Sequence, residues 1–176
     1  MTPVLVDDLK RYIRDIPDFP KKGILFRDIT TLLSNPGAFK TSIDQLVSQF
    51  LNKGIQKVVG IESRGFLTAA PLAYHLGAGF IPVRKRGKLP HKTNSVTYEL
   101  EYGVDTLEIH DDAILKGEKV LIADDLLATG GTASATCDLV EKSGGHVAGV
   151  AFLIELSGLN GREKLKKHNV FSLIQY

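Results

Sequence analysis

The sequence predicts an α/β protein built on a doubly wound, mostly parallel sheet that helices flank. Short apolar runs alternate along the chain with stretches of helical periodicity. The runs are apolar at consecutive positions, as in strands that are buried on both faces. The 176 residues are 43% hydrophobic and 24% charged, a composition typical of one globular domain. We expect a small N-terminal hood over residues 1–33 and a core over residues 34–176.

The N-terminal third is predicted to hold two helices. Apolar residues recur at helical spacing within Pro3–Ile16, which predicts a first helix that Pro17 ends. An extended stretch is expected over Lys22–Leu33. The second helix is expected over Ala38–Asn52, and Gly54 closes it.

From residue 55 onward, the predicted strands alternate with helices. Glycines follow both predicted helices, as is common just past a helix end. The expected strands are Ile55–Ile61, Phe80–Val83, Val120–Ala123, Val147–Ile154 and Phe171–Ile174, and the expected helices are Phe66–His75 and Thr132–Glu141.

The segment Lys92–Asp112 interrupts this alternation. It lacks a clear helical period, and a connection of this length in a compact domain is usually functional or mobile. One interpretation is a lid that closes over a bound substrate. The other is a surface hairpin in which Ser95–Leu100 pairs with Thr106–Ile109. The sequence leaves both interpretations open.

Charge and cysteine content exclude several classes of protein. The formal net charge is only +2, so no overall basic field predicts nucleic-acid binding. Cys137 is the one cysteine, which rules out an internal disulfide framework and fits a reducing compartment. The N-terminus carries Asp7 and Asp8 without an apolar segment, and no apolar run approaches the roughly 20 residues that span a bilayer. We therefore expect a cytoplasmic protein that binds neither nucleic acid nor membrane.

The segment Val120–Thr132 carries the strongest functional signal. A buried strand runs into Asp124 and Asp125, and a glycine-rich turn then opens a helix. Ligands of open α/β sheets bind at the carboxyl ends of strands, and a helix N-terminus attracts phosphate. Two carboxylates would repel a phosphate but accept hydrogen bonds from vicinal ribose hydroxyls. The pattern therefore predicts a site for a ribose 5-phosphate.

Other phosphate-binding motifs do not fit this segment. A P-loop requires a lysine after its glycines, and a dinucleotide fold requires GxGxxG after its strand; the sequence has neither. A tight strand–helix turn with solvated acids is the structural alternative, which the acid pair, Thr129 and Thr132 disfavour.

Ile122–Thr132 resembles the phosphoribosyl pyrophosphate (PRPP) signature of type I phosphoribosyltransferases. Further segments, in order along nearly the whole chain, are similar to the adenine phosphoribosyltransferase family. They are Phe26-Arg27-Asp28-Ile29, Ser63-Arg64-Gly65-Phe66, Arg84-Lys85-Arg86-Gly87-Lys88-Leu89-Pro90, Leu100-Glu101-Tyr102-Gly103 and Gly161-Arg162-Glu163-Lys164-Leu165.

The resemblance implies the type I phosphoribosyltransferase fold and a Mg²⁺-dependent reaction of adenine with PRPP that gives AMP and pyrophosphate. It implies a homodimer. It implies no fixed protein site for the metal, since PRPP itself would hold most of the Mg²⁺. The residue roles it implies fall into four groups. Glu101, Tyr102 and Arg64 would be catalytic; Asp124, Asp125, Ala128, Thr129, Gly130, Gly131 and Thr132 would bind PRPP and AMP; Glu62, Ser63, Arg64, Arg84 and Lys88 would bind pyrophosphate; and Leu25, Phe26 and Arg27 would bind adenine.

Two other functions are compatible with the PRPP signature alone. A PRPP-sensing regulator would need an added DNA-binding module or a strong basic face, for which 176 residues at net charge +2 leave little room. A phosphoribosyltransferase for hypoxanthine or xanthine is disfavoured by the likeness of Phe26-Arg27 and of the Glu101 loop. A panel of bases separates these alternatives.

Overall fold

A computed structural model describes residues 4–99 and 103–176. The chain forms two compact units, Met1–Gln45 and Leu46–Tyr176. The first unit reaches further along the sequence than the expected hood, and the domain boundary after residue 33 stays a prediction. Over the described residues, every helix falls short of the length and apolarity that crossing a bilayer requires.

The N-terminal unit begins with a short 3₁₀ helix, η1 (Val6–Tyr12), and an antiparallel hairpin of β1 (Arg14–Pro17) and β2 (Leu25–Asp28). The prediction of one helix over Pro3–Ile16 is therefore wrong from Arg14 onward. Strand pairing overrides the helical periodicity, because Ile16 lies opposite Phe26 and Arg14 lies opposite Asp28.

Asp28 ends β2 and starts the next helix. Its carboxylate accepts hydrogen bonds from the backbone N–H of Thr30 at 2.9 Å and from Arg14 at 2.6 Å. These bonds fix α1 (Thr30–Ser34), so the expectation of an extended chain as far as Leu33 is wrong beyond β2. They also lower the pKa of Asp28 to about 2.

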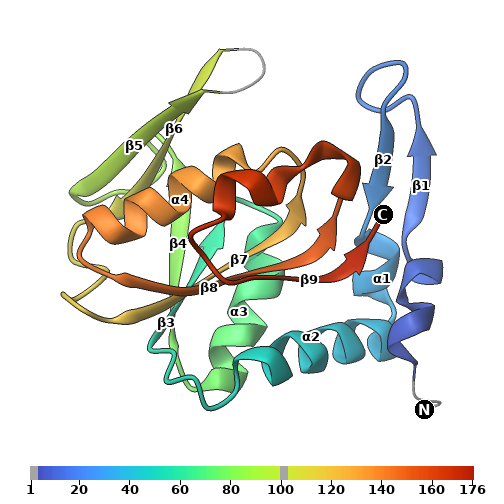
Figure 1. The fold of residues 1–176 in the computed structure, drawn as a ribbon, viewed down its shortest axis with the longest axis horizontal. Helices are drawn as coiled ribbons and strands as arrows, with labels where there is room; N and C mark the ends of the chain where they lie inside the picture. The colour runs from blue at the N-terminus through green and yellow to red at the C-terminus, as the bar shows by residue number, and fades with distance from the viewer. Residues whose placement is uncertain (1–3, 100–102) are drawn as a thin grey trace. The chain divides into compact units, whose positions relative to one another are not determined.

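The second unit is built on a seven-stranded sheet. Its strand order is β5-β6-β4-β3-β7-β8-β9, and the five strands from β4 to β9 run parallel (Figure 1). This confirms the doubly wound, mostly parallel α/β prediction. The strands are β3 (Lys57–Ile61), β4 (Gly79–Lys85), β5 (Thr93–Glu99), β6 (Val104–His110), β7 (Lys119–Leu127), β8 (His146–Glu155) and β9 (Val170–Gln175), and the helices are α3 (Gly65–Leu76), α4 (Gly131–Lys142), η2 (Ser157–Leu159) and η3 (Gly161–Leu165). The boundary between the two units falls within α2 (Pro36–Phe50).

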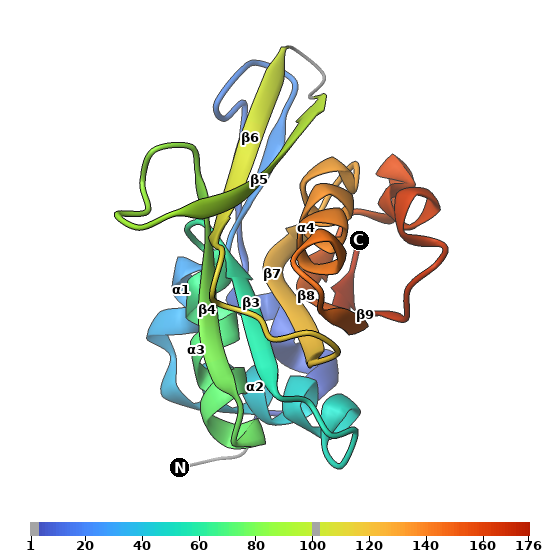
Figure 2. The ribbon, with the colours of Figure 1, turned by 90° about the vertical axis from the view of Figure 1, so that its left-hand side faces the viewer.

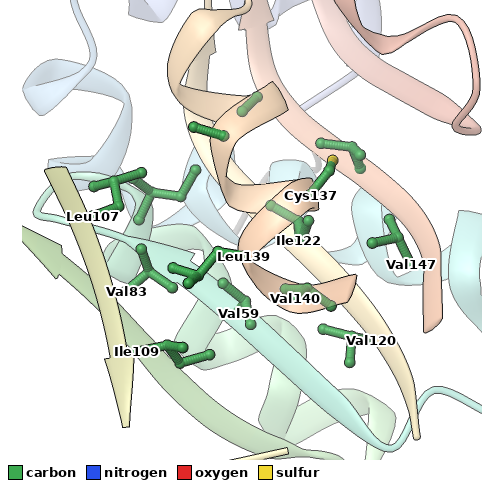
Figure 3. Packing of buried hydrophobic residues seen from close by; sticks show 14 of the residues in the cluster. Val59, Val83, Leu107, Ile109, Val120, Ile122, Cys137, Leu139, Val140 and Val147 are labelled. Atoms are coloured by element: carbon green, nitrogen blue, oxygen red, sulfur yellow. The ribbon is translucent and has the colours of Figure 1, made fainter. Parts of the chain in front are cut away.

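Alternate residues of the central strands fill two separate cores. On β7, Val120 and Ile122 face the core that α4 covers, whereas Leu121 and Ala123 face the core under α3. Figure 2 shows α3 and α4 on opposite faces of the sheet. Figure 3 shows the larger core, where Cys137 and Leu139 of α4 pack onto the strands. Burial on both faces explains why these strands read as continuous apolar runs.

The segment Lys92–Asp112 contains a β-hairpin, as one of its two interpretations predicted. β5 and β6 pair antiparallel along seven residues each, and Val96 lies opposite Leu107. The tip of the hairpin, residues 100–102, lies outside the described residues. The lid interpretation therefore stays a prediction.

Candidate active site

The site gathers at the carboxyl ends of β3, β4 and β7. β7 runs past the acid pair as far as Leu127, so the expectation that this strand ends at Ala123 is wrong. Pairing with β8 continues through Asp124 opposite Phe152 and Leu126 opposite Ile154. The two acids are thus held rigidly within a strand of the sheet rather than on a mobile turn.

The glycine-rich turn after β7 forms a pocket at the start of α4. Gly130 caps this helix with φ +77°, a left-handed conformation that favours glycine. The first N–H groups of a helix have no partner within it, and the first turn of α4 holds no acidic residue. The pocket measures about 90 Å³ and is lined by Asp124, Leu126, Leu127, Ala128, Thr129, Gly130, Gly131, Thr132 and Ala133. Its size, dipole and exposed amides suit one phosphate group.

The two acids differ in their surroundings. Asp125 is 5% exposed, and its carboxylate lies 2.9 Å from Nε of Arg64. Asp124 borders the phosphate pocket and accepts a 2.9 Å hydrogen bond from the backbone N–H of Asp125. Burial and the neighbouring charge of Asp125 raise the pKa of Asp124 well above 3.8. Asp124 is therefore the acid that most needs hydrogen-bond donors from a ligand.

The turn after β3 lies against this acid pair. Arg64 precedes α3, and Gly65 begins it. A β-carbon on Gly65 would lie 2.6 Å from Oδ1 of Asp124, so only glycine permits this approach. The ion pair brings Arg64, an expected pyrophosphate-binding residue, next to Asp125, an expected PRPP-binding residue. No role was predicted for Gly65, although the Ser63-Arg64-Gly65-Phe66 segment contains it.

Glu62 pairs with two of the three cationic residues that are expected to bind pyrophosphate. Its carboxylate pairs with Nζ of Lys88 and with Nε of Arg84, the latter at 3.3 Å, and accepts a 3.0 Å bond from the backbone N–H of Lys85. Burial alone would raise the pKa of Glu62, but these bonds hold it below its usual value. A single buried carboxylate thus compensates two cations at the mouth of the site, and the peptide bond between Glu62 and Ser63 is cis.

The hairpin is tied to the phosphate pocket by one side chain. The hydroxyl of Tyr98, on β5, lies 3.2 Å from Oγ1 of Thr132. No role was predicted for Tyr98. The expected catalytic residues Glu101 and Tyr102 come later in the sequence and lie outside the described residues.

The expected adenine-binding residues lie on β2 of the N-terminal unit. Leu25 is 46% exposed, and Phe26 packs edge-to-face against Phe19 with ring centroids 5.2 Å apart. The guanidinium of Arg27 pairs with the carboxylate of Asp15 across the hairpin. The segment therefore presents apolar surface beside an anchored cation.

Comparisons with known proteins identify the family of the chain and its fold. A family model described as a phosphoribosyl transferase domain matches residues 28–175. The chain is 61% identical, over 169 residues, to an adenine phosphoribosyltransferase of Brachyspira hyodysenteriae, covering 96% of this chain and 99% of that protein. Its fold superposes with a TM-score of 0.95 on the crystal structure of adenine phosphoribosyltransferase from Thermoanaerobacter pseudethanolicus, at 53% identity, covering 98% and 100% of the two chains. The Saccharomyces cerevisiae enzyme, solved in complex with adenine and a bisphosphate, gives a TM-score of 0.90 at 45% identity, covering 96% and 97%.

Proposed function

The chain belongs to the phosphoribosyl transferase family, and we propose on that basis which residues bind each part of the substrates. It transfers the 5-phosphoribosyl group of PRPP to adenine, giving AMP and pyrophosphate in purine salvage. The observation that carries the assignment of residues is the phosphate-sized pocket beside Asp124 at the start of α4.

The pocket binds the 5-phosphate of PRPP. Backbone N–H groups from Ala128 to Gly131 and the hydroxyls of Thr129 and Thr132 are its donors. These donors are fixed before the ligand arrives, so binding does not require the loop to be ordered first. The dipole of α4 adds attraction for a dianion.

Asp124 and Asp125 accept hydrogen bonds from the ribose hydroxyls. Burial disfavours the charged form of Asp124, and hydroxyl donors offset that cost once the ribose is bound. Arg64 compensates the charge of Asp125 from behind. The pair therefore orients the ribose ring while its phosphate lies in the neighbouring pocket.

Arg64, Arg84 and Lys88, with Ser63, bind the pyrophosphate group. Pyrophosphate gains negative charge as its bond to the ribose breaks, and cations aimed at it stabilise that charge in the transition state. In the free protein, Glu62 compensates Arg84 and Lys88. A multiply charged pyrophosphate competes with this single carboxylate for both cations.

Adenine is held by Leu25, Phe26 and Arg27, whose apolar surface and backbone suit a planar base. N9 of adenine must lose its proton as it bonds to the ribose. Glu101 takes or relays that proton, with Tyr102 beside it, as the resemblance to the family implies. A hairpin tip that closes over the base also excludes water from the reacting carbon.

Mg²⁺ accompanies PRPP in this family, and the residues present fit a metal that is carried by the substrate. Over the described residues, no three His, Cys, Asp or Glu side chains gather into a metal cage. Mg²⁺ typically uses one or two carboxylates together with substrate phosphates, and Asp124 is the carboxylate that lines the pocket. When bound, the ion neutralises part of the charge on pyrophosphate.

The assignment is tested with a panel of bases. Purified protein is incubated with PRPP and Mg²⁺ together with adenine, hypoxanthine or guanine, and the nucleotide formed is measured by chromatography. We expect AMP to form far faster than the other nucleotides, and EDTA to stop the reaction. Faster turnover of guanine would overturn the choice of base, and no turnover of any base would favour a PRPP sensor.

We further infer that the enzyme is a cytoplasmic homodimer. The resemblance to the adenine phosphoribosyltransferase family supports the dimer, and the single buried cysteine, Cys137, suits a reducing compartment. Sedimentation equilibrium at micromolar protein concentration measures the oligomeric state directly. A mass near 19.2 kDa would rule out the dimer under those conditions.

A further inference from the structure

The phosphate loop rests on the backbone of Gly161, without any intervening side chain. A β-carbon on Gly130 would lie 2.3 Å from the carbonyl oxygen of Gly161. A β-carbon on Gly161 would lie 2.2 Å from the carbonyl oxygen of Ala128 and 2.9 Å from Cδ1 of Leu127. Both distances are shorter than real β-carbons tolerate. The position of Gly161 therefore sets how far the loop can move toward η3.

Arg162, the next residue, is anchored by a network of five hydrogen bonds. Its Nε donates to both oxygens of Glu155, at 2.8 and 3.0 Å, and its Nη2 donates to the same carboxylate at 2.7 Å. Nη1 donates to the carbonyl oxygen of Val170 at 3.0 Å, and Nη2 contacts Oγ of Ser172 at 3.3 Å. All three guanidinium nitrogens are thus engaged, and they join η3 to the end of β8 and to β9.

The partners of Arg162 are themselves rigid. Glu155 is 5% exposed and pairs with β9 opposite Gln175. On the other side of η3, Leu165 is 1% exposed and packs into the core that α4 covers. Figure 1 shows η3 (red-orange) beside α4, in agreement with the contacts between these two elements. η3 is therefore fixed to the sheet at one end and to the core at the other.

We propose that Arg162 and Glu155 are positioning residues for the 5-phosphate of PRPP. They hold the backbone of Gly161 in a fixed position against Ala128 and Gly130. The loop N–H groups are thereby directed at the phosphate. Preorganised donors bind well only within a narrow range of distance and direction, so a small shift of Gly161 weakens phosphate binding. The inference rests on the proposed assignment of the loop to the 5-phosphate.

This role is separable from a purely structural one. An ion pair that only stabilised the fold would affect adenine, pyrophosphate and AMP binding alike, or none of them. A positioning pair affects the ligands that carry the 5-phosphate. The difference appears as a rise in KM for PRPP, and in Kd for AMP, without a matching rise in KM for adenine.

The test uses Arg162→Lys in the full-length protein. Lysine keeps the charge, but its single nitrogen cannot bond Glu155, Val170 and Ser172 together. We expect Kd for AMP and KM for PRPP to rise about tenfold. That is the smaller end of the loss in affinity that follows when a residue supporting a metal ligand is removed. KM for adenine should stay within about twofold of the wild type, as should kcat. Glu155→Gln, which keeps the shape of the acid, should give the same pattern if Arg162→Lys fails to fold.

Two controls make the outcomes distinct. Val147→Ala trims a buried side chain at the far end of β8 and reports the effect of lost stability alone. Thr132→Val removes a loop hydroxyl and tests the loop assignment itself. Normal AMP affinity in Arg162→Lys with weakened affinity in Thr132→Val overturns the positioning role and leaves the proposed function standing. Normal AMP affinity in both Arg162→Lys and Thr132→Val overturns the positioning role and the assignment of the loop to the 5-phosphate. Equal losses of AMP affinity in Arg162→Lys and Val147→Ala also overturn the positioning role.

Discussion

The two regions of the site that we propose to bind anions are held in contrasting ways. The phosphate pocket from Asp124 to Thr132 is shaped by backbone, with Gly130 packed on Gly161 and the first turn of α4 left free of acids. The pyrophosphate region is shaped by side chains, because Glu62 pairs with both Arg84 and Lys88. The pocket is therefore ready for a phosphate in the free protein, whereas the cations already have a counter-charge. Binding in the first region fills a gap, and binding in the second exchanges one anion for another.

Substitution of the acid pair, Asp124 at the pocket and Asp125 beside it in β7, should weaken PRPP binding more than any other change. Asp124→Asn combined with Asp125→Asn removes two charged acceptors of ribose hydroxyls, each worth about 1.5–3 kcal/mol. KM for PRPP should therefore rise by about 10²–10⁴-fold. Asp138→Asn, on the exposed face of α4, is the matched control. Wild-type PRPP affinity in a folded double variant would remove the acids from the site.

A smaller effect is expected in the pyrophosphate region. Glu62→Gln keeps the shape of the side chain but removes the counter-charge of Arg84 and Lys88. Pyrophosphate should then inhibit the enzyme about 2–10-fold more strongly, because these half-exposed pairs are each worth about 1 kcal/mol or less. Inhibition constants are measured against PRPP at fixed Mg²⁺. Weaker inhibition would mean that Glu62 assists pyrophosphate rather than competing with it.

The smallest effect concerns stability. Burial raises the pKa of Asp124 above 3.8, so the folded protein binds this proton more tightly than the unfolded chain does. Ionisation of Asp124 therefore lowers the free energy of unfolding. This loss of stability begins as the pH rises above about 3.8, the ordinary pKa, and is complete once the pH exceeds the raised pKa of the folded protein. Asp124→Asn should increase the Tm of the ligand-free protein at pH 7.5 by about 2–4 °C, the shift that roughly 1 kcal/mol produces at this size. If the Tm of Asp124→Asn at pH 7.5 is equal to or below that of the wild type, and the difference between the two proteins is the same at pH 4, ionised Asp124 does not destabilise the fold.

The sequence predicted the parallel core because its strands are buried on both faces. Val120–Ala123 and Val147–Ile154 appear as unbroken apolar runs, and in the structure both lie on interior strands of the sheet, with a neighbouring strand on each side. The prediction of a helix as far as Ile16 was wrong because the apolar residues there have helical spacing, whereas the residues that pair with this segment lie further along the chain. Arg14 bonds Asp28 and Ile16 lies opposite Phe26, contacts that no local pattern reveals.

The same distinction applies to the site. Asp124 to Thr132 form one contiguous motif, so its phosphate chemistry was predictable from residue types and spacing. The partners of Glu62 lie 22 and 26 residues away along the chain, and no periodicity predicts that they meet. Gly161 reaches the loop through a backbone contact, which leaves no trace in side-chain chemistry. Only its place in the Gly161-Arg162-Glu163-Lys164-Leu165 segment marked it.

We propose that the two regions bind opposite halves of PRPP, and the two products, AMP and pyrophosphate, separate those halves. Calorimetric titration of AMP and of pyrophosphate with Mg²⁺ is carried out on Gly131→Ala and on Lys88→Ala. A β-carbon on Gly131 meets no atom of the described chain closer than 3.7 Å, so this variant should fold and obstruct only the phosphate. We predict that Gly131→Ala weakens AMP binding about tenfold or more and spares pyrophosphate, and that Lys88→Ala does the reverse. Equal losses of both ligands in either variant would contradict the division of the site.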